Sequence, residues 1–338
     1  MSHSASPWTD ARFLVVGCGS IGKRHMENLR RLGVADILAV EPSEDRRKEV
    51  AERFGARAFG DLGMALGEQP EVALICTPPS LHIGQAMAAA RAGCHLFVEK
   101  PVADALDGVD ELIAEVHRAS LVNLVACNFR FHPGLRHIKK LLEGGELGTV
   151  VSARAQFGQY LPDWHPWEDY RLGYSARREL GGGVALDRIH EIDYMRWLFG
   201  EIDEVHAFAA KLSGLEIDTE DTVEIVMRFT SGTLGSVHLD YVRRTYDASL
   251  EIVGDLGTAR WRYQDRCVEW TLAGESEWRR MAWPDYDDNQ MYIDELRHLF
   301  RVLAGEEAAE LDLAGAKRDL EVALEARESF YARPATVA

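Results

Sequence analysis

An apolar run that stops abruptly at three glycines constrains the fold of this chain more than any other stretch. Residues 12–22 read RFLVVGCGSIG, and an amphipathic helical pattern, KRHMENLRRLG, follows them directly. Gly17, Gly19 and Gly22 have the spacing that ends a β-strand, lets backbone approach a pyrophosphate and packs a helix against the strand. Glycine turns without a ligand also occur at this spacing. The strand before and the helix after favour a dinucleotide site, in which the first N–H groups of the helix meet the phosphates.

A carboxylate at the end of the next apolar run supports this interpretation. The run ILAVE ends at Glu41, about 20 residues after the last glycine, where the dinucleotide fingerprint places the acid that binds the adenosine ribose. The competing interpretation is a solvated residue at a strand end. We expect NAD as the cofactor, because a carboxylate here disfavours the 2′-phosphate of NADP. Arg46 and Arg47 follow one helical turn later, so NADP stays an alternative.

The composition excludes several classes of protein. The chain has 338 residues, which favours two domains, and a formal net charge of −17, which argues against nucleic acid or an anionic membrane as its main partner. No apolar stretch is long enough to span a membrane, and the N-terminal stretch MSHSASPWTD lacks the features of a secretory signal. The five cysteines are scattered without CxxC spacing, and no His or Cys positions show paired zinc-ligand spacing. We expect a cytoplasmic protein with reduced cysteines and no metal, and His190 with its nearby carboxylates stays the alternative metal position.

Apolar runs of the buried-strand type alternate with helical patterns as far as Ala126. This alternation predicts a parallel sheet covered on both faces, which is a doubly wound α/β fold. In such a sheet the ligand lies at the carboxyl ends of the strands. Those ends carry Gly17, Glu41, Thr77, Glu99 with Lys100, and Asn128.

From about Val150 the pattern changes to strands joined by tight turns, which predicts a mostly antiparallel sheet. The expected strands cover residues 150–156, 205–211, 222–228, 234–240, 248–253, 258–261 and 267–272. Helices are expected at residues 133–143, 184–199, 290–304 and 313–331. We therefore predict a Rossmann dinucleotide-binding domain at residues 1–128 and a substrate-binding and oligomerisation α/β domain at residues 129–338.

Lys100 is the first candidate for catalysis. It follows the strand LFV in the sequence EKP, and Pro101 removes a backbone donor and restricts the backbone of Lys100, so the lysine is held at the sheet edge. A lysine that is partly desolvated beside a cofactor can have its proton affinity lowered into a useful range. An ordinary surface lysine is the competing interpretation.

The second candidate group lies in GGGVALDRIHEIDYMRWLFG, residues 181–200. The glycines relieve backbone crowding, and the expected helix puts Asp187 and His190 at positions i and i+3 of one face, with Glu191 at i+4. That face can present an acid and an imidazole to one ligand. In isolation, a capping or packed histidine, with Asp187 and Asp193 paired to Arg188 or Arg196, explains the pattern better.

A loop rich in aromatic and polar groups, GQYLPDWHPWEDYR, precedes these glycines at residues 158–171. Its rings could stack on the apolar face of a sugar while its polar groups bond the hydroxyls. A packed loop or a subunit contact explains the composition equally well. The residues predicted to contact substrate are Tyr160, Trp164, His165 and Tyr170, together with Arg130 near the cofactor edge.

Six motifs of this chain occur together, in the same order, in one known family. They are GCGSIGKRH, CTPPSLH, AGCHLFVEKP, NFRFHPG, GELGTV and GGGVALDRIHEID. Together they resemble the Gfo/Idh/MocA family of nicotinamide-dependent sugar and cyclitol oxidoreductases. The resemblance implies a Rossmann domain followed by an α/β domain with an open, largely antiparallel sheet that is often used for oligomer contacts, so we expect a homo-dimer or homo-tetramer. It also implies a cis bond before Pro101, and that Lys100, Asp187 and His190 converge on the substrate beside the nicotinamide.

One departure from the family's pattern concerns the histidine. Many members place it four residues after the aspartate, whereas here His190 stands at the third position and Glu191 at the fourth. Aligning HEID with the family's HxxD favours His190, and Glu191 stays an alternative. The strand ends and the resemblance together predict the cofactor-binding residues Gly17, Gly19, Ser20, Ile21, Gly22, Glu41, Thr77, Pro78, His82, Glu99 and Asn128.

The activity implied by the resemblance is reversible oxidation of a secondary alcohol on a sugar, sugar derivative or inositol, with hydride passing to or from the nicotinamide. Lys100 or His190 would carry the proton, and Asp187 would orient the imidazole or the substrate hydroxyl. Two alternatives remain. One is a glycoside hydrolase that uses NAD for transient redox, and the other is a noncatalytic NAD-sensing protein, which would not need these three residues together.

Overall fold

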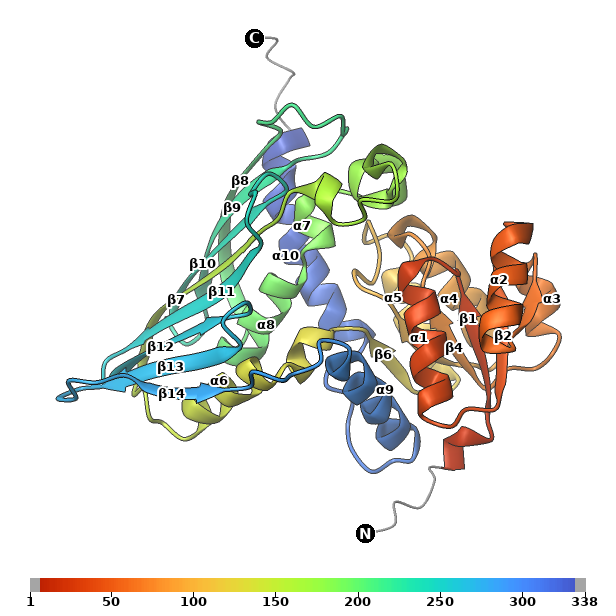
Figure 1. The fold of residues 1–338 in the computed structure, drawn as a ribbon, viewed down its shortest axis with the longest axis horizontal. Coiled ribbons are helices and arrows are strands. Elements are labelled where there is room, and N and C mark those ends of the chain that lie inside the picture. Colours follow the sequence, from red (N-terminus) through yellow and green to blue (C-terminus); the bar gives the residue numbers. More distant parts are fainter. Residues whose placement is uncertain (1–6, 332–338) are drawn as a thin grey trace. The chain divides into compact units, whose positions relative to one another are not determined.

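The computed structural model describes residues 7–331 of the chain, which form two units (Figure 1). The first unit contains residues 7–128 and Asn289–Arg318, and the second contains Phe129–Asp288 and residues 319–331. The expectation that the N-terminal stretch is no secretory signal concerns residues 1–10, and residues 1–6 of it lie outside the described part of the chain. The return of Asn289–Arg318 to the first unit differs from the sequence-based division, which assigns residues 129–338 to one domain.

Six parallel strands form the sheet of the first unit, in the order β3-β2-β1-β4-β5-β6. Their bounds are β1 Arg12–Val16, β2 Asp36–Val40, β3 Arg57–Phe59, β4 Val72–Ile75, β5 His95–Val98 and β6 Asn123–Val125. This is the order of a doubly wound dinucleotide-binding sheet, which reverses between β1 and β4 and binds ligands outside the carboxyl ends of its strands. The predicted fold class is confirmed for this half.

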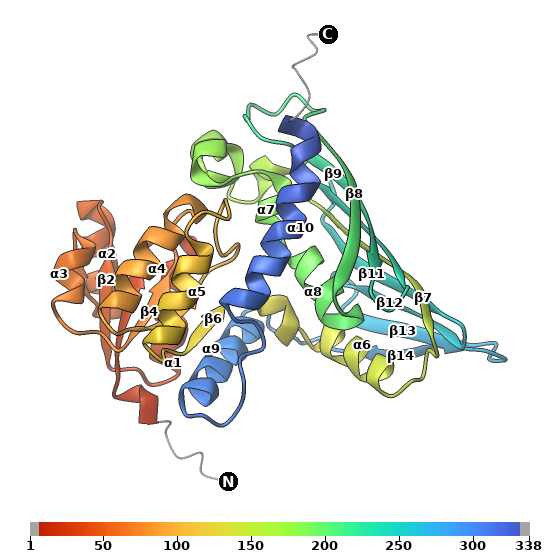
Figure 2. The same ribbon diagram turned by 180° about the vertical axis from the view of Figure 1, so that it is seen from behind.

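Helices cover both faces of this parallel sheet (Figures 1 and 2). Helices α1 (Ser20–Arg31) and α9 (Gln290–Leu303) pack side by side on one face, and α4 (His82–Arg91) and α5 (Val109–Arg118) pack together on the other. Two more helices, α2 (Glu44–Phe54) and α3 (Leu62–Leu66), follow β2 and β3 in the chain. The strands are therefore covered on both sides, which explains why their sequences are apolar without alternation.

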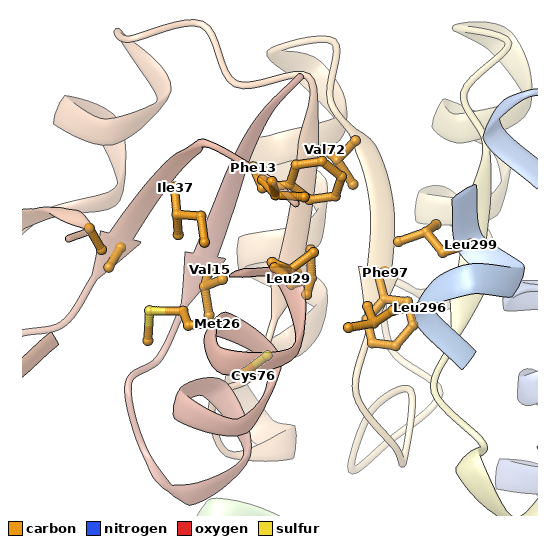
Figure 3. Packing of buried hydrophobic residues seen from close by; sticks show 14 of the residues in the cluster. Phe13, Val15, Met26, Leu29, Ile37, Val72, Cys76, Phe97, Leu296 and Leu299 are labelled. Atoms are coloured by element: carbon orange, nitrogen blue, oxygen red, sulfur yellow. The ribbon is translucent and has the colours of Figure 1, made fainter. Parts of the chain in front are cut away.

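The core beneath α1 and α9 joins residues that are distant in the sequence (Figure 3). Phe13 and Phe97 of the sheet belong to one buried cluster with Leu296, Leu299 and Phe300 of α9, and the rings of Phe13 and Phe300 lie 5.7 Å apart. The apolar residues of α9 recur at helical spacing, so this helix has one face to bury. Burial of that face is the physical reason why Asn289–Arg318 belongs to the first unit.

The sheet of the second unit has eight strands, in the order β14-β13-β12-β11-β7-β10-β9-β8. Their bounds are β7 Val150–Gly158, β8 Ile202–Ala210, β9 Thr222–Phe229, β10 Leu234–Asp240, β11 Asp247–Gly254, β12 Gly257–Arg262, β13 Cys267–Leu272 and β14 Arg279–Ala282. Neighbouring strands are antiparallel except β7 and β10, which pair in parallel. The mostly antiparallel sheet is confirmed, and β14 is an addition that the sequence did not predict.

Helices lie against one face of this second sheet, as Figures 1 and 2 show. Helix α6 (Pro133–Glu143) packs on β12 and β13, and α8 (His190–Phe199) packs on β7 and β10. Helix α7 (Val184–Asp187) contacts β9 and β10, and residues 319–331 of α10 (Leu313–Tyr331) also belong to this unit. The other face carries exposed apolar side chains on β8, β9 and β10, which are Phe208, Val226 and Leu234.

Candidate active site

The three glycines after β1 are required for different reasons. Gly17 has a φ of +94°, and a Cβ there would lie 2.8 Å from the carbonyl oxygen of Cys76 and 2.9 Å from Cγ2 of Thr77. A Cβ on Gly22 would lie 2.0 Å from the carbonyl oxygen of Gly17, so only glycine lets α1 approach the loop this closely. Beside Gly19, no described atom other than its chain neighbours comes within 4 Å of the Cβ position. Gly17 and Gly22 shape the loop, and Gly19 leaves space for a ligand.

Helix α1 begins directly after this loop without a side-chain cap. The N-cap residue is Gly19, which has no side chain that could accept an N–H of the first turn. The first turn also contains no acidic residue. The first N–H groups of a helix have no intrahelical acceptors and carry partial positive charge, so this end of the helix attracts an anion. Ser20 and Ile21, which the sequence predicts to bind the cofactor, lie in this turn.

Glu41 is a buried carboxylate that follows β2 and is fixed by backbone. Its side chain accepts the N–H of Cys18 at 3.1 Å and the N–H of Ser43 at 3.0 Å. Nη1 of Arg46 lies 3.9 Å from the same carboxylate, and Arg47 donates to the carbonyl oxygen of Glu41 at 2.8 Å. The acid is therefore held against the glycine loop, with two cations beside it.

His82 joins the turns that follow β4 and β5. Its ring nitrogens lie 2.7 Å from the carbonyl oxygen of Thr77 and 2.9 Å from that of Pro101, and the side chain is fully buried. Burial lowers the pKa of His82, although both carbonyl contacts act in the opposite direction. The hydroxyl of Thr77 donates to Oε1 of Gln85 at 2.6 Å. His82 thus holds together the predicted cofactor turn at Thr77 and Pro78 and the turn that contains Lys100, from a buried position.

Glu99 and Lys100 stand at the end of β5, and the bond between Lys100 and Pro101 is cis, as the resemblance implied. The buried carboxylate of Glu99 lies 2.6 Å from Nε2 of His25 on α1, and it accepts the N–H of Lys100 at 3.2 Å. Burial alone would raise the pKa of Glu99. The hydrogen bond and charge of His25 and the charge of Lys100 lower that pKa by more than burial raises it, so the net pKa is below its ordinary value. The sequence analysis missed His25, and its place in KRH after the glycines was the available signal.

Asn128 follows β6, the last strand of the sheet in the first unit. Its side-chain amide donates to the sulfur of Met291 at 3.1 Å, and the N–H of Cys127 donates to Glu295 at 2.7 Å. Both partners belong to α9. Helix α9 therefore holds the side chain of Asn128, the predicted cofactor residue that follows β6.

In the second unit, Asp187 and His190 lie on two separate helices. Helix α7 ends at Asp187, α8 begins at His190, and Arg188 between them has a ψ of 39°, which interrupts the α-helical path. The prediction of one helix over residues 184–199 is therefore wrong, and so is the argument that i and i+3 spacing puts these side chains on one helical face. No glycine or proline marks the break, so the sequence carried no ordinary signal of it.

The carboxylate of Asp187 is almost fully buried and accepts three hydroxyl groups. Tyr174 donates to Oδ1, while Ser175 and Tyr241 donate to Oδ2 at 2.7 and 3.1 Å. Tyr174 and Ser175 precede the glycine run, and Tyr241 follows β10. None of the three was predicted as a site residue. Only the fold brings them to Asp187, because Tyr241 is 54 residues away in sequence.

His190 and Glu191 are both buried at the start of α8, in different surroundings. The ring of His190 lies 4.9 Å from that of Phe129. Glu191 pairs with Arg188 at 2.9 Å, and the guanidinium of Arg188 lies 3.5 Å from the centre of the Phe157 ring. Burial alone would lower the pKa of Arg188, but Glu191 and other neighbours raise it, so the arginine stays charged. Because Glu191 forms a buried ion pair with Arg188, His190 is the better candidate for the acid or base.

The predicted substrate residues have different environments. Arg130 is buried in a bidentate ion pair with Asp193, with nitrogen to oxygen distances from 2.6 to 3.1 Å. Trp164 packs edge-on against Tyr241, with ring centres 5.4 Å apart, and so lies next to the hydroxyl groups around Asp187. The other three residues are placed as follows: Tyr160 under Arg244 at 3.6 Å, His165 exposed beside Trp167, and Tyr170 accepting the N–H of Glu216 at 3.1 Å.

The described residues contain no group of three or more His, Cys, Asp and Glu side chains arranged to hold a metal ion. All five cysteines lie within residues 7–331, where they are buried and form no disulfide. Between residues 7 and 331, no helix has the length and apolar character that crossing a membrane requires.

The doubly wound sheet, the glycine loop and the buried acid after β2 are the features of a dinucleotide-binding domain. Residues 11–127 match the model of the oxidoreductase family with an NAD-binding Rossmann fold, and residues 135–260 match the GFO/IDH/MocA C-terminal domain. The chain belongs to the Gfo/Idh/MocA family of oxidoreductases. The resemblance inferred from the six motifs, the NAD cofactor and the dehydrogenase class are thereby confirmed.

Two relatives and one solved structure illustrate the similarity. Myo-inositol 2-dehydrogenase of Thermotoga maritima is 33% identical over 257 residues, which cover 73% of each chain. Levoglucosan dehydrogenase of Pseudarthrobacter phenanthrenivorans is 30% identical over 264 residues, covering 70% of this chain and 66% of the relative. A structure of levoglucosan dehydrogenase in complex with NADH matches 96% of this chain and 97% of its own, with a TM-score of 0.86 and 23% identity. That structure supports the fold.

Proposed function

We propose that this protein catalyses the reversible, NAD-dependent oxidation of a secondary alcohol on a sugar, sugar derivative or inositol. The observation that carries the cofactor part is the loop after β1, where Gly19 borders open space, α1 begins uncapped and Glu41 is fixed against Cys18. These residues fit a dinucleotide, because they supply anion-binding N–H groups and an acceptor for ribose hydroxyls. The substrate part rests on relatives named for inositol, levoglucosan and apiose.

Each candidate catalytic residue has one task in this proposal. Bound NAD would supply the acceptor for the hydride of the alcohol carbon. Lys100 or His190 takes the hydroxyl proton, and Asp187 orients the imidazole or the substrate hydroxyl. Burial supports the last role, since a carboxylate enclosed by hydroxyl groups keeps one orientation. In this proposal the first unit binds the cofactor and the second unit supplies substrate contacts, among them Tyr160, Trp164, His165 and Tyr170.

The experiment is a screen of sugars, nucleotide sugars and inositols for formation of NADH, followed by the Lys100→Ala variant with the best substrate. We expect turnover to fall by about 10²- to 10⁴-fold while NADH binding is retained, because general acid–base groups contribute effects of that size. Lys48→Ala, an exposed lysine on α2, is the matched control. Near wild-type turnover of Lys100→Ala would exclude the lysine from the chemistry. Release of sugar from a glycoside without net NADH would instead favour the hydrolase alternative.

We also propose that the protein is a cytoplasmic homo-dimer or homo-tetramer that associates through the open face of the second sheet. Phe208, Val226 and Leu234 expose 70%, 55% and 55% of their surfaces on neighbouring strands of that face. Exposed apolar side chains that cluster in this way favour association with another surface. Light scattering of the wild type and of Val226→Glu tests this, and a monomeric wild type would contradict it.

A further inference from the structure

The glycine run before α7 has a packing role that bears on Asp187. A Cβ on Gly182 would lie 2.1 Å from the carbonyl oxygen of Tyr174 and 2.8 Å from that of Ser175. The N–H of Gly183 donates to the carbonyl oxygen of Ser175 at 3.1 Å. The glycines therefore let the backbone of the Tyr174–Ala176 turn lie directly against the start of α7. This contact brings two hydroxyl groups to the carboxylate at the end of the same helix.

The hydroxyl groups use most of the acceptor capacity of Asp187. A carboxylate has about four lone-pair positions. Tyr174 donates to Oδ1, and Ser175 and Tyr241 donate to Oδ2. Hydrogen bonds of this kind favour the charged form of the acid, which opposes the effect of burial. The arrangement thus suits a permanent carboxylate better than a group that gains and loses a proton in each turnover.

Tyr241 is held in place as a donor to this carboxylate. Its side chain is fully buried, and burial together with the charge of Asp187 raises the pKa of Tyr241 well above its ordinary value, so the hydroxyl keeps its proton. Trp164 packs edge-on against the ring of Tyr241 and against Phe157, at 5.4 and 5.8 Å between ring centres. The loop predicted to contact substrate is therefore linked to Asp187 through the Tyr241 ring.

We infer that Tyr174, Ser175 and Tyr241 are positioning residues that hold Asp187 as an oriented carboxylate, so that Lys100 or His190, and not Asp187, takes the substrate proton. The inference rests on the proposed function, because it assigns roles within that reaction. It adds three residues to the site and gives the orienting role of Asp187 a structural cause. The hydroxyl groups act through Asp187 and need no contact with the substrate.

The first test compares Ser175→Ala/Tyr241→Phe with the wild type on the best alcohol substrate. We expect kcat to fall about tenfold while the KM for NAD is unchanged, since each lost hydrogen bond to a charged acceptor has a substantial effect. Hydrogen bonds from hydroxyl groups favour the charged carboxylate, so the loss of kcat toward acid pH should begin at a higher pH in the double variant than in the wild type. The Ser175→Thr variant keeps a hydroxyl group at this position, so its kcat and its pH profile should match those of the wild type. An unchanged pH profile in the double variant would overturn the inference.

The second test does not depend on activity. Urea unfolding is measured for Tyr241→Phe, Asp187→Asn and the double variant, which together form a double-mutant cycle. We expect Tyr241→Phe to reduce the folding equilibrium constant about five- to tenfold in the wild type and clearly less in Asp187→Asn. Additive effects would overturn the inference. Ser329→Ala, which removes a hydroxyl that accepts the N–H of Ala209, should be additive with Asp187→Asn.

The two tests separate this inference from the proposed function. If the wild type oxidises no alcohol in the screen, the proposed function fails, while the unfolding cycle still reports whether Tyr241 acts on Asp187. If the alcohol is oxidised and the cycle is additive, the function stands and the positioning role falls.

Discussion

Nε2 of His25 lies 2.6 Å from Oε1 of Glu99, although 74 residues separate them in the sequence. Neither side chain is open to solvent, with side-chain exposures of 0% and 9%. The second oxygen of Glu99 accepts the N–H of Lys100 at 3.2 Å. One carboxylate therefore connects the helix after the glycine loop to the backbone of the lysine proposed for catalysis.

His25→Ala should destabilise the protein by about 3 kcal/mol at neutral pH, because it leaves the carboxylate of Glu99 buried without its partner. The pKa of Glu99 in the folded state lies below its ordinary value. The ionised carboxylate therefore stabilises the fold fully at pH values above the ordinary pKa, and this stabilisation is lost as the pH falls through the folded-state pKa. The difference in unfolding free energy between wild type and variant should therefore shrink in acid. Urea unfolding at a series of pH values measures it.

His206→Ala is the control for this pH series. His206 is exposed and pairs with Glu204 at the surface, so its removal should change the unfolding free energy by less than about 1 kcal/mol. A difference for His25→Ala that stays constant from neutral to acid pH would show that the ion pair with Glu99 is not its cause.

Glu41→Ala should weaken NAD binding by about 1.5 to 3 kcal/mol, the usual contribution of hydrogen bonds to a charged group. Arg46 lies 3.9 Å from the carboxylate and would then face the ribose without an acid, so affinity for NADP should rise relative to NAD. Parallel titrations of both cofactors measure the change. Glu44→Ala, at an exposed position of α2, is the control. Equal loss of affinity for both cofactors would indicate a structural role of Glu41 in the loop.

Gly19→Ala and Gly22→Ala should fail in different ways. The Cβ at Gly19 enters open space, so the variant should fold normally and lose NAD affinity by about tenfold or more, because the methyl group occupies the approach to the pyrophosphate. The Cβ at Gly22 would lie 2.0 Å from a carbonyl oxygen, so that variant should unfold at lower temperature even without cofactor. Calorimetry with and without NAD separates the two outcomes. Normal NAD affinity of Gly19→Ala would contradict the assigned ligand path.

Arg130→Ala should act on stability instead of substrate binding. The guanidinium is the bidentate partner of Asp193, and its loss leaves a fully buried carboxylate uncompensated, which costs about 3 to 5 kcal/mol. Arg228→Ala, at an exposed pair with Asp203, should cost less than about 1 kcal/mol. Unfolding and substrate KM are measured for both variants. A raised KM with unchanged stability would restore the substrate role that the sequence predicts for Arg130.

Features set by short-range sequence pattern were predicted well. The strands of both sheets follow from apolar runs and alternation, and the glycine loop, Glu41 and the cis bond before Pro101 stand in motifs of continuous sequence. β14 was missed because RRMA on an exposed edge strand has no apolar alternation. The break after Asp187 was missed because the helical periodicity continues through Arg188.

Features set by contacts between distant residues were not predictable from one sequence. The hydroxyl groups on Asp187 come from segments before and after α7, and nothing in their local sequence distinguishes Tyr241 from other buried tyrosines. The pairing of Arg130 with Asp193 likewise depends on how the segment after β6 meets α8. Sequence motifs point to Asp187, His190 and Lys100 as candidates, but they could not indicate which groups contact these side chains.

The return of α9 to the first unit has a consequence for biosynthesis. Leu296, Leu299 and Phe300 fill part of the core that Phe13 and Phe97 begin, so the nascent chain emerging from the ribosome cannot complete this core until α9 has been made. The whole second sheet is synthesised in the interval. A fragment that ends at residue 128 lacks Leu296, Leu299 and Phe300, so it exposes an apolar surface that the intact chain buries.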